Sequence, residues 1–142
     1  MKAAAVLDTN QWVSAGVQPK GNPARIVELG AQDRLRILTC EAIWDELTGV
    51  LQLPRLRKAH RLSDLELNNW LETMRQIAHW TPGEVIVDAV LADPDDNLVV
   101  ACAVEGGADY IITGDQHLLT LESYASISIV TPSAFLEIWA ED

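Results

Sequence analysis

Several features are scarce in this sequence of 142 residues, and each scarcity excludes a class of protein. There are only two cysteines, Cys40 and Cys102, both in apolar surroundings, so a disulfide-stapled fold is excluded and a reducing cytoplasm is expected. The longest fully apolar runs span a handful of residues, far short of the ~20 that a membrane helix needs. The first strand-like run begins at Ala3, which leaves no room before it for a signal peptide. We therefore expect a cytoplasmic protein with no membrane association.

Positive charge is missing from the C-terminal part of the chain. All ten Lys and Arg lie within residues 1–75, where nine acids accompany them, whereas residues 76–142 carry twelve acids and no Lys or Arg. The net charge of −11 argues against nucleic-acid binding, but Arg55, Arg57, Lys58 and Arg61 gather in one short stretch. That stretch either contacts phosphates or is an ordinary solvated turn between helices. An acidic half is also what a chain needs to hold multivalent cations.

Segments of strand and helix character alternate along the chain, with no visible repeat or linker. The patterns predict strands at residues 3–7, 35–38, 85–87, 110–113 and 127–130. They predict helices at residues 22–31, 41–51, 63–79, 93–106 and 131–140. This alternation indicates a parallel sheet covered by helices on both faces, and the length fits one domain over residues 1–142.

Acidic residues follow the predicted strands at the points where those strands end. Asp8 comes directly after the first strand, Asp115 follows the strand at 110–113, and the DPDDN sequence at 93–97 opens a helix. Because ligands of open parallel sheets bind beyond the carboxyl ends of the strands, we expect these acids to converge. Glu46 lies at the margin of the apolar stripe of helix 41–51 and can reach the same cleft, whereas Asp45 points to solvent.

A set of carboxylates without a cluster of Cys or His suits a hard cation, and Mg²⁺ or Mn²⁺ is the expected occupant. Such an ion activates water and neutralises the charge that builds on a phosphate during cleavage. The sequence contains no GxxxxGK[ST] loop, GxSxG elbow or HExxH motif. Structural alternatives remain open: Asp8 as a turn cap, Asp93 and Asp95 as acids favoured at a helix start, and Glu46 as a surface residue.

Histidine and tryptophan are interpreted as structural residues at this stage. His60, His79 and His117 look isolated, which favours surface or packing roles. The tryptophans are expected to pack in the core, except Trp12, which stands near Asp8 and is a candidate for stacking on a base.

These motifs, in this order and spacing, resemble those of PIN-domain proteins, and specifically the VapC-like toxin components of bacterial and archaeal toxin–antitoxin systems. The resemblance covers essentially the whole chain. It rests on VLDTN at 6–10, EL at 46–47, DPDDN at 93–97, ITGDQHLL at 112–119 and ISIVTPSAFL at 127–136. One departure is visible, since Cys40 stands before the Glu46 helix where such proteins often have a serine.

The resemblance implies a three-layer α/β/α sandwich around a parallel sheet and an Mg²⁺- or Mn²⁺-dependent endoribonuclease that hydrolyses RNA phosphodiester bonds. It also implies a cognate antitoxin partner and a homodimer. The implied catalytic acids are Asp8, Glu46, Asp96 and Asp115, of which Asp8, Asp96 and Asp115 hold metal. Asn10, Thr113 and Asp93 match supporting positions, and the basic residues Arg55, Arg57, Lys58 and Arg61 are assigned to RNA contacts.

The main rival is a non-catalytic PIN domain that binds RNA or a protein partner without cutting. A phosphoryl-acceptor protein that uses Asp8 fits poorly, because Asn10 replaces the second acid of dehalogenase-type sites and no Lys follows Lys58 for a receiver domain. A structure-specific DNA nuclease uses the same chemistry, but this chain is short for the insertions that grip DNA.

Overall fold

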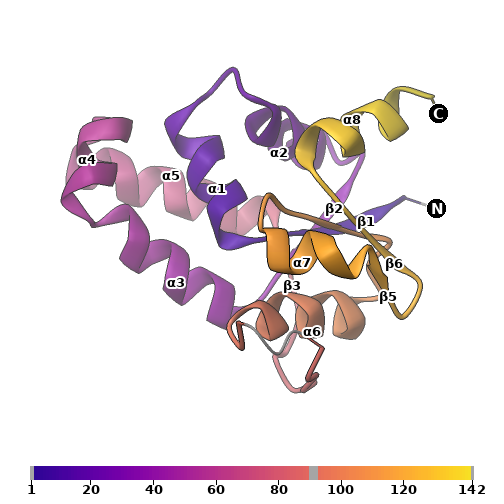
Figure 1. The fold of residues 1–142 in the computed structure, drawn as a ribbon. Coiled ribbons are helices and arrows are strands. Elements are labelled where there is room, and N and C mark those ends of the chain that lie inside the picture. The colour runs from indigo at the N-terminus through magenta and orange to yellow at the C-terminus, as the bar shows by residue number, and fades with distance from the viewer. Residues whose placement is uncertain (1, 90–92, 142) are drawn as a thin grey trace.

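A computed structural model describes residues 2–89 and 93–141 (Figure 1). The described strands are β1 (Ala4–Leu7), β2 (Arg36–Thr39), β3 (His79–Trp80), β4 (Tyr110–Ile112), β5 (Ser123–Tyr124) and β6 (Ile127–Val130). The described helices are α1 (Thr9–Val17), α2 (Asn22–Ala31), α3 (Glu41–Leu51), α4 (Pro54–His60), α5 (Asp64–Ile77), α6 (Asp96–Gly106), α7 (Gln116–Leu121) and α8 (Pro132–Glu141).

The strands form one sheet in the order β3-β2-β1-β4-β6-β5, with helices on both sides. Every neighbouring pair is parallel except β5–β6, which is antiparallel. All four residues of β1 are buried, as expected for a central strand covered on both faces. In Figure 1, α6 lies below the sheet, α2 and α8 lie above it, and α3, α4 and α5 extend to its left. The α/β/α sandwich with a mostly parallel sheet confirms the predicted fold class.

The order of the strands reverses beside β1, and this reversal positions the acids. The chain moves outward from β1 to β2 and β3, then returns to place β4 on the other side of β1. Leu7 pairs with Ile112, and the Asp8 N–H continues the ladder by donating to the Ile112 carbonyl at 3.3 Å. A switch point of this kind opens a crevice between the two strand ends. Asp8 and Thr113 therefore lie side by side at that crevice.

Trp12 is part of the core, so the prediction that it stacks on a base is wrong. Its side chain is 0% exposed, and it packs edge-on against Trp44 with ring centroids 5.6 Å apart. Trp44 in turn contacts Trp80 in the same edge-on manner. Cys40 and Cys102 are both buried free thiols, which confirms that they behave as small core residues.

The strand expected at residues 85–87 is not formed, and β3 lies earlier in the chain. The Thr81 N–H donates to the Thr39 carbonyl at 2.9 Å, and alternate residues of a parallel strand bond the same neighbour, so the next N–H that would face β2 is that of Gly83. The Gly83 and Glu84 N–H groups donate instead to the Glu105 carboxylate of α6, at 2.7 and 3.0 Å. The following segment is thus held against a helix, and Ile86 is 93% exposed.

Two further local predictions change. Helix α6 begins at Asp96 with Asp95 at its N-cap, rather than at Asp93-Pro94 as predicted, so Asp96 is its first residue. Residues 54–60 form the helix α4 rather than a turn, and its cations Arg55 and Lys58 are exposed to solvent. Helices α1 and α7 and the short strands β3 and β5 were not anticipated. Among the described residues, no helix is both long and apolar enough to span a membrane.

Candidate metal centre

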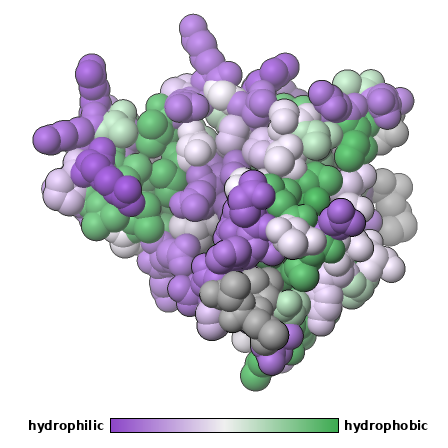
Figure 2. Space-filling view, in the orientation of Figure 1, coloured by the Kyte–Doolittle hydropathy of each residue, from purple (hydrophilic) through white to green (hydrophobic). Residues whose placement is uncertain are grey.

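The predicted acids converge on one cleft at the carboxyl edge of the sheet. The cleft has a volume of about 150 Å³. Figure 2 shows hydrophilic side chains gathered in a band down the middle of this face, between the side of α1 and α3 and that of α7. The acids in its lining are Asp8, Glu46, Asp93, Asp95, Asp96 and Asp115. Asn10 also lines the cleft, whereas no Lys or Arg does so among the described residues.

Asp8 is fixed in place by hydrogen bonds to both of its carboxylate oxygens. Oδ1 accepts from the Gln11 N–H at 3.0 Å, which caps α1, and Oδ2 accepts from the Thr113 hydroxyl. Thr113 also accepts the Asp115 N–H at 2.9 Å, so one buried hydroxyl links the acids that follow β1 and β4. Burial raises the pKa of Asp8 above its usual value, although the bonds from Thr113 and Gln11 oppose that rise. The capping and site roles predicted as alternatives for Asp8 are therefore compatible.

The pKa of Asp96 is raised by its surroundings. Burial is the largest cause that raises its pKa to about 7, followed by a hydrogen bond with the Asp115 carboxyl that only protonated Asp96 makes. The charges of Asp115, Asp93 and Asp8 raise it further. Its Oδ2 atom is buried and receives no hydrogen bond from any described residue. When Asp96 is ionised, that oxygen is available to bind a cation.

Glu46 and its neighbour Asp45 are both exposed on α3, as the surface alternative for Glu46 expects, but only Glu46 lines the cleft. This difference follows from the helix, because the buried residues Ile43 and Leu47 orient α3 toward the core and leave Glu46 at the margin of that face. The stripe argument from the sequence therefore selected the acid that faces the cleft.

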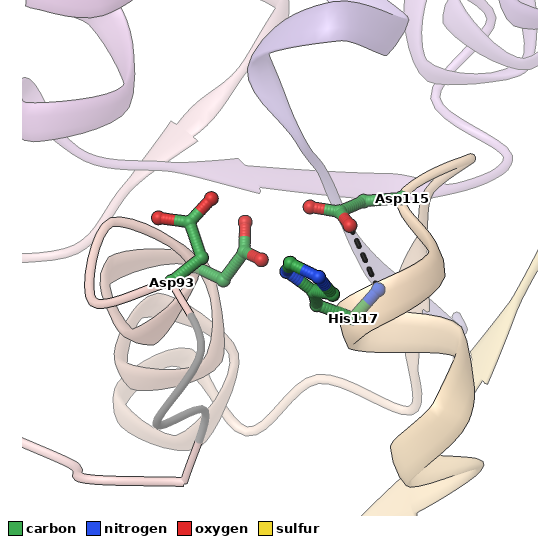
Figure 3. A group of neighbouring side chains, drawn as sticks. Asp93, Asp115 and His117 are labelled. Atoms are coloured by element: carbon green, nitrogen blue, oxygen red, sulfur yellow. Dashed lines mark hydrogen bonds between the residues drawn. The ribbon is translucent and has the colours of Figure 1, made fainter.

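His117 is a neighbour of the acids that sequence reasoning missed. One potential ligand atom from each of Asp93, Asp96, Asp115 and His117 lies within 4.8 Å of all the others. Figure 3 shows the His117 ring beside Asp93 and Asp115, with the His117 N–H donating to Asp115 Oδ1 at 2.8 Å. The expectation that His117 is isolated is wrong, although it is exposed as predicted. The available signal was its place two residues after Asp115, at the start of the unforeseen α7.

The oxygen-rich donor set fits a hard divalent cation. Asp93, Asp96 and Asp115 each bring one carboxylate oxygen into a close group, and Asp96 also has a buried oxygen without a described partner. Asp8 and Glu46 face the same cleft but do not belong to this close group. The close group therefore shares Asp96 and Asp115 with the metal set predicted from the sequence, and it adds Asp93.

The four basic residues assigned to RNA do not line the cleft. Arg55 and Lys58 lie on α4, and Arg61 caps that helix with a left-handed φ of 58°. All three are exposed. Arg57 is occupied by an ion pair with Asp64 at 2.8 Å and by a hydrogen bond to Gln52.

Comparison with known families gives a match to the PIN domain over residues 4–117, which is most of the chain. The chain belongs to the PIN-domain family. The matched segment of this PIN domain runs from β1 into α7 and contains all the residues that line the cleft.

Two further comparisons, one of sequence and one of fold, found similar proteins. The PIN domain is 29% identical to an uncharacterised protein of Methanocaldococcus jannaschii, over 96% of this chain and 92% of that protein. Its fold is also similar to a chain in the crystal structure of VapBC2 from Rickettsia felis bound to a DNA fragment from their promoter. That match has a TM-score of 0.56 and 15% identity, and it covers 89% of this chain and 96% of the other. At that identity, the likeness concerns the fold.

Proposed function

We propose that this PIN domain is a divalent-metal-dependent endoribonuclease and the toxin component of a VapC-like, type II toxin–antitoxin system. One observation carries the proposal: acids from separate segments of the chain line one cleft together with Asp96, whose buried Oδ2 has no hydrogen-bond partner among the described residues. The single sheet and its contiguous core support treating residues 1–142 as one PIN-like domain.

The acids of the cleft take separate roles in this proposal. Asp96 and Asp115 hold the ion, with Asp93 beside them. Asp8 is held by hydrogen bonds from Thr113 and Gln11, so its carboxylate adds negative charge at a fixed place in the same cleft. Glu46 faces the cleft from a different helix and is free of hydrogen bonds to described residues, which suits it to bind or orient water. Asn10 contributes a polar side chain to the lining.

A bound Mg²⁺ or Mn²⁺ ion would supply two effects, an increase in the acidity of water and neutralisation of the charge on the phosphate under attack. Without a cation the lining repels RNA, because acids surround the cleft and no Lys or Arg lines it among the described residues. The same carboxylates therefore require a cation before a phosphodiester can approach.

RNA contacts are assigned to the exposed cations at α4. Arg55, Lys58 and Arg61 are exposed. Arg57 forms an ion pair with Asp64 and a hydrogen bond with Gln52, so we assign it a smaller role in RNA binding. Helix α4 directly follows α3, the helix that carries Glu46.

Partners are proposed by analogy with the similar structure, which is a VapBC2 assembly. A cognate antitoxin protein is the first partner expected, and a homodimer is the second. A cytoplasmic location is consistent with both.

The test is RNA cleavage by the purified chain. Total RNA is incubated with Mn²⁺ or with EDTA, beside an Asp96→Asn variant, and new RNA ends are mapped by sequencing, because a selective enzyme cuts too few sites for a gel to reveal. Asp45→Asn on the solvent face of α3 is the matched control. New ends that require both the metal and Asp96, and that survive in the control, support the proposal.

The competing function is a PIN domain that binds RNA or a protein partner without cutting. It predicts that no new RNA ends depend on the metal. It also predicts that the unaltered chain shows no Mn²⁺ binding that is lost in Asp96→Asn. That pair of results would overturn the nuclease proposal.

A further inference from the structure

The His117 imidazole is the nitrogen donor in the group of potential ligands that surrounds Asp96. Its ring nitrogen lies within 4.8 Å of one oxygen each from Asp93, Asp96 and Asp115. The ring is exposed, and no described residue forms a hydrogen bond with it. The backbone N–H of His117 holds Asp115 Oδ1 at 2.8 Å, so backbone and ring are both directed at this one group (Figure 3).

We propose that His117 is a metal ligand and that its nitrogen makes the site select Mn²⁺ over Mg²⁺. The inference rests on the proposed function, in which the neighbouring carboxylates hold a divalent ion. Mg²⁺ binds oxygen almost exclusively, whereas imidazole ligands favour transition metals. A site made only of carboxylates discriminates weakly between the two ions, and one nitrogen donor shifts the preference toward Mn²⁺.

The spacing of the group is compatible with a single ion. Ligand atoms on opposite sides of an octahedral ion with bonds of about 2.1 Å lie about 4.2 Å apart. The four atoms already lie within 4.8 Å of one another, so small rotations of exposed or half-exposed side chains bring them to that spacing. His117 is the side chain best able to rotate, because its ring is exposed.

A neutral fourth ligand also matters for the charge of the site. Three carboxylates and a divalent ion leave a net charge of −1, and a fourth carboxylate in place of His117 would leave −2. The extra negative charge would repel an RNA phosphate more strongly. A neutral imidazole completes the ligand set without that cost.

The opposite role for His117 is a protonated imidazolium that pairs with the acids. In that role the ring would compete with a cation, and its removal would strengthen metal binding. The two roles therefore predict changes of opposite sign in Mn²⁺ affinity when His117 is replaced.

The experiment measures binding of the metal alone to the full chain. Mn²⁺ binding is followed by electron paramagnetic resonance, Mg²⁺ binding by competition, and pulsed resonance detects coupling between Mn²⁺ and a ligand nitrogen. The variants are His117→Ala and His117→Asp, with His79→Ala as the matched control, since His79 is exposed and lies on the edge strand β3. Thermal unfolding in EDTA establishes that each variant folds.

His117→Ala should weaken Mn²⁺ binding by at least about tenfold and Mg²⁺ binding far less, and it should abolish the nitrogen coupling. His117→Asp should narrow the preference for Mn²⁺, and His79→Ala should change nothing. Equal loss for both ions, tighter Mn²⁺ binding, or no nitrogen coupling in the unaltered chain would overturn the role of His117. If Asp96→Asn weakens Mn²⁺ binding in those cases, the proposed metal site stands and only this inference fails. If the unaltered chain binds neither ion, both fail.

Discussion

At the scale of single residues, Asp96 is the acid of the cleft whose charged form is disfavoured by burial and by several neighbouring acids. Its pKa in the folded chain is about 7, against an ordinary 3.8, because burial and the neighbouring acids disfavour its charged form. The folded chain therefore keeps a proton between these two values that the unfolded chain has lost. This proton contributes to the free energy of unfolding. The contribution is fully present below about pH 4 and is lost as the pH rises through about 7.

The first prediction concerns the metal-free protein. In EDTA, the melting temperature of the unaltered chain should fall between pH 5 and pH 8 more steeply than that of Asp96→Asn, because the asparagine is neutral throughout. Thermal unfolding across this range measures the difference. Asp95→Asn is the control, since Asp95 is exposed and should keep the steep dependence. Parallel curves for the unaltered chain and Asp96→Asn would contradict the raised pKa.

The second prediction concerns the Thr113 hydroxyl, which donates to Asp8 and accepts from the Asp115 N–H. Thr113→Val keeps the shape of the side chain and leaves both partners unsatisfied in a buried place, which should cost about 1–3 kcal/mol of unfolding free energy. Thr113→Ser keeps the hydroxyl and should cost much less. Urea unfolding compares the two variants, and equal stability would show that the hydroxyl does not link the acids.

Residue types alone were sufficient for part of the site. Asp8 and Asp115 could be placed because a carboxylate after a buried parallel strand has a fixed location, and Glu46 because helical periodicity put it at a stripe margin. His117 could not be placed, since its position depends on α7, a helix of 6 residues with no periodicity to detect. The base-stacking role predicted for Trp12 failed for a related reason. Helix α1 was not predicted, so the sequence did not show that Trp12 lies on its buried face.

At the scale of elements, close packing of α6 on the sheet positions Asp96. A Cβ added at Gly106 would lie 2.6 Å from Leu38 Cδ1 and 3.1 Å from Thr81 Cγ2, both from the sheet side of the helix. Glycine at this position therefore lets the end of α6 approach β2 closely. The opposite end of the same helix begins at Asp96.

The third prediction follows from that contact. Gly106→Ala should destabilise the fold by about 1–3 kcal/mol, because the added methyl must displace the buried Leu38 side chain or the helix itself. Gly49→Ala on α3 is the control, since no atom lies within 4 Å of its added Cβ, and it should stabilise by up to about 0.5–1 kcal/mol. Denaturant unfolding of both variants checks the contrast. A neutral Gly106→Ala would mean that α6 has room to shift.

Elements marked by cap signals, apolar stripes or apolar runs were predictable from the sequence, whereas α1, α7 and the two-residue strands β3 and β5 were not. Helices α2 and α3 match their predicted bounds because cap signals and apolar stripes define them. The segment 85–87 has strand-like composition, but the Gly83 and Glu84 N–H groups just before it bind the Glu105 carboxylate instead of a neighbouring strand. Those contacts join residues about twenty positions apart, and no local pattern records them.

At the scale of the whole molecule, charge is divided between an acidic cleft and a few exposed cations. The fourth prediction is that a triple reversal of Arg55, Lys58 and Arg61 to Glu reduces RNA cleavage and flattens its dependence on salt, because fewer counterions are released on binding. Cleavage rates across a salt series measure this slope.

The matched control for that prediction lies at the opposite edge of the sheet. Lys2, Arg34 and Arg36 are exposed and stand at the amino ends of β1 and β2, away from the carboxyl edge where the cleft opens. Reversing these three changes the net charge equally. If both triple variants flatten the salt slope to the same extent, α4 is not the site of RNA contact.

The central claim is that acids from distant parts of the chain form one divalent-metal site. The most direct test is anomalous X-ray diffraction from crystals of the chain soaked in Mn²⁺, beside crystals of Asp96→Asn. The account predicts a manganese peak within bonding distance of Asp96 and Asp115 that is lost in the variant. A peak elsewhere, or equal peaks in both crystals, would contradict it.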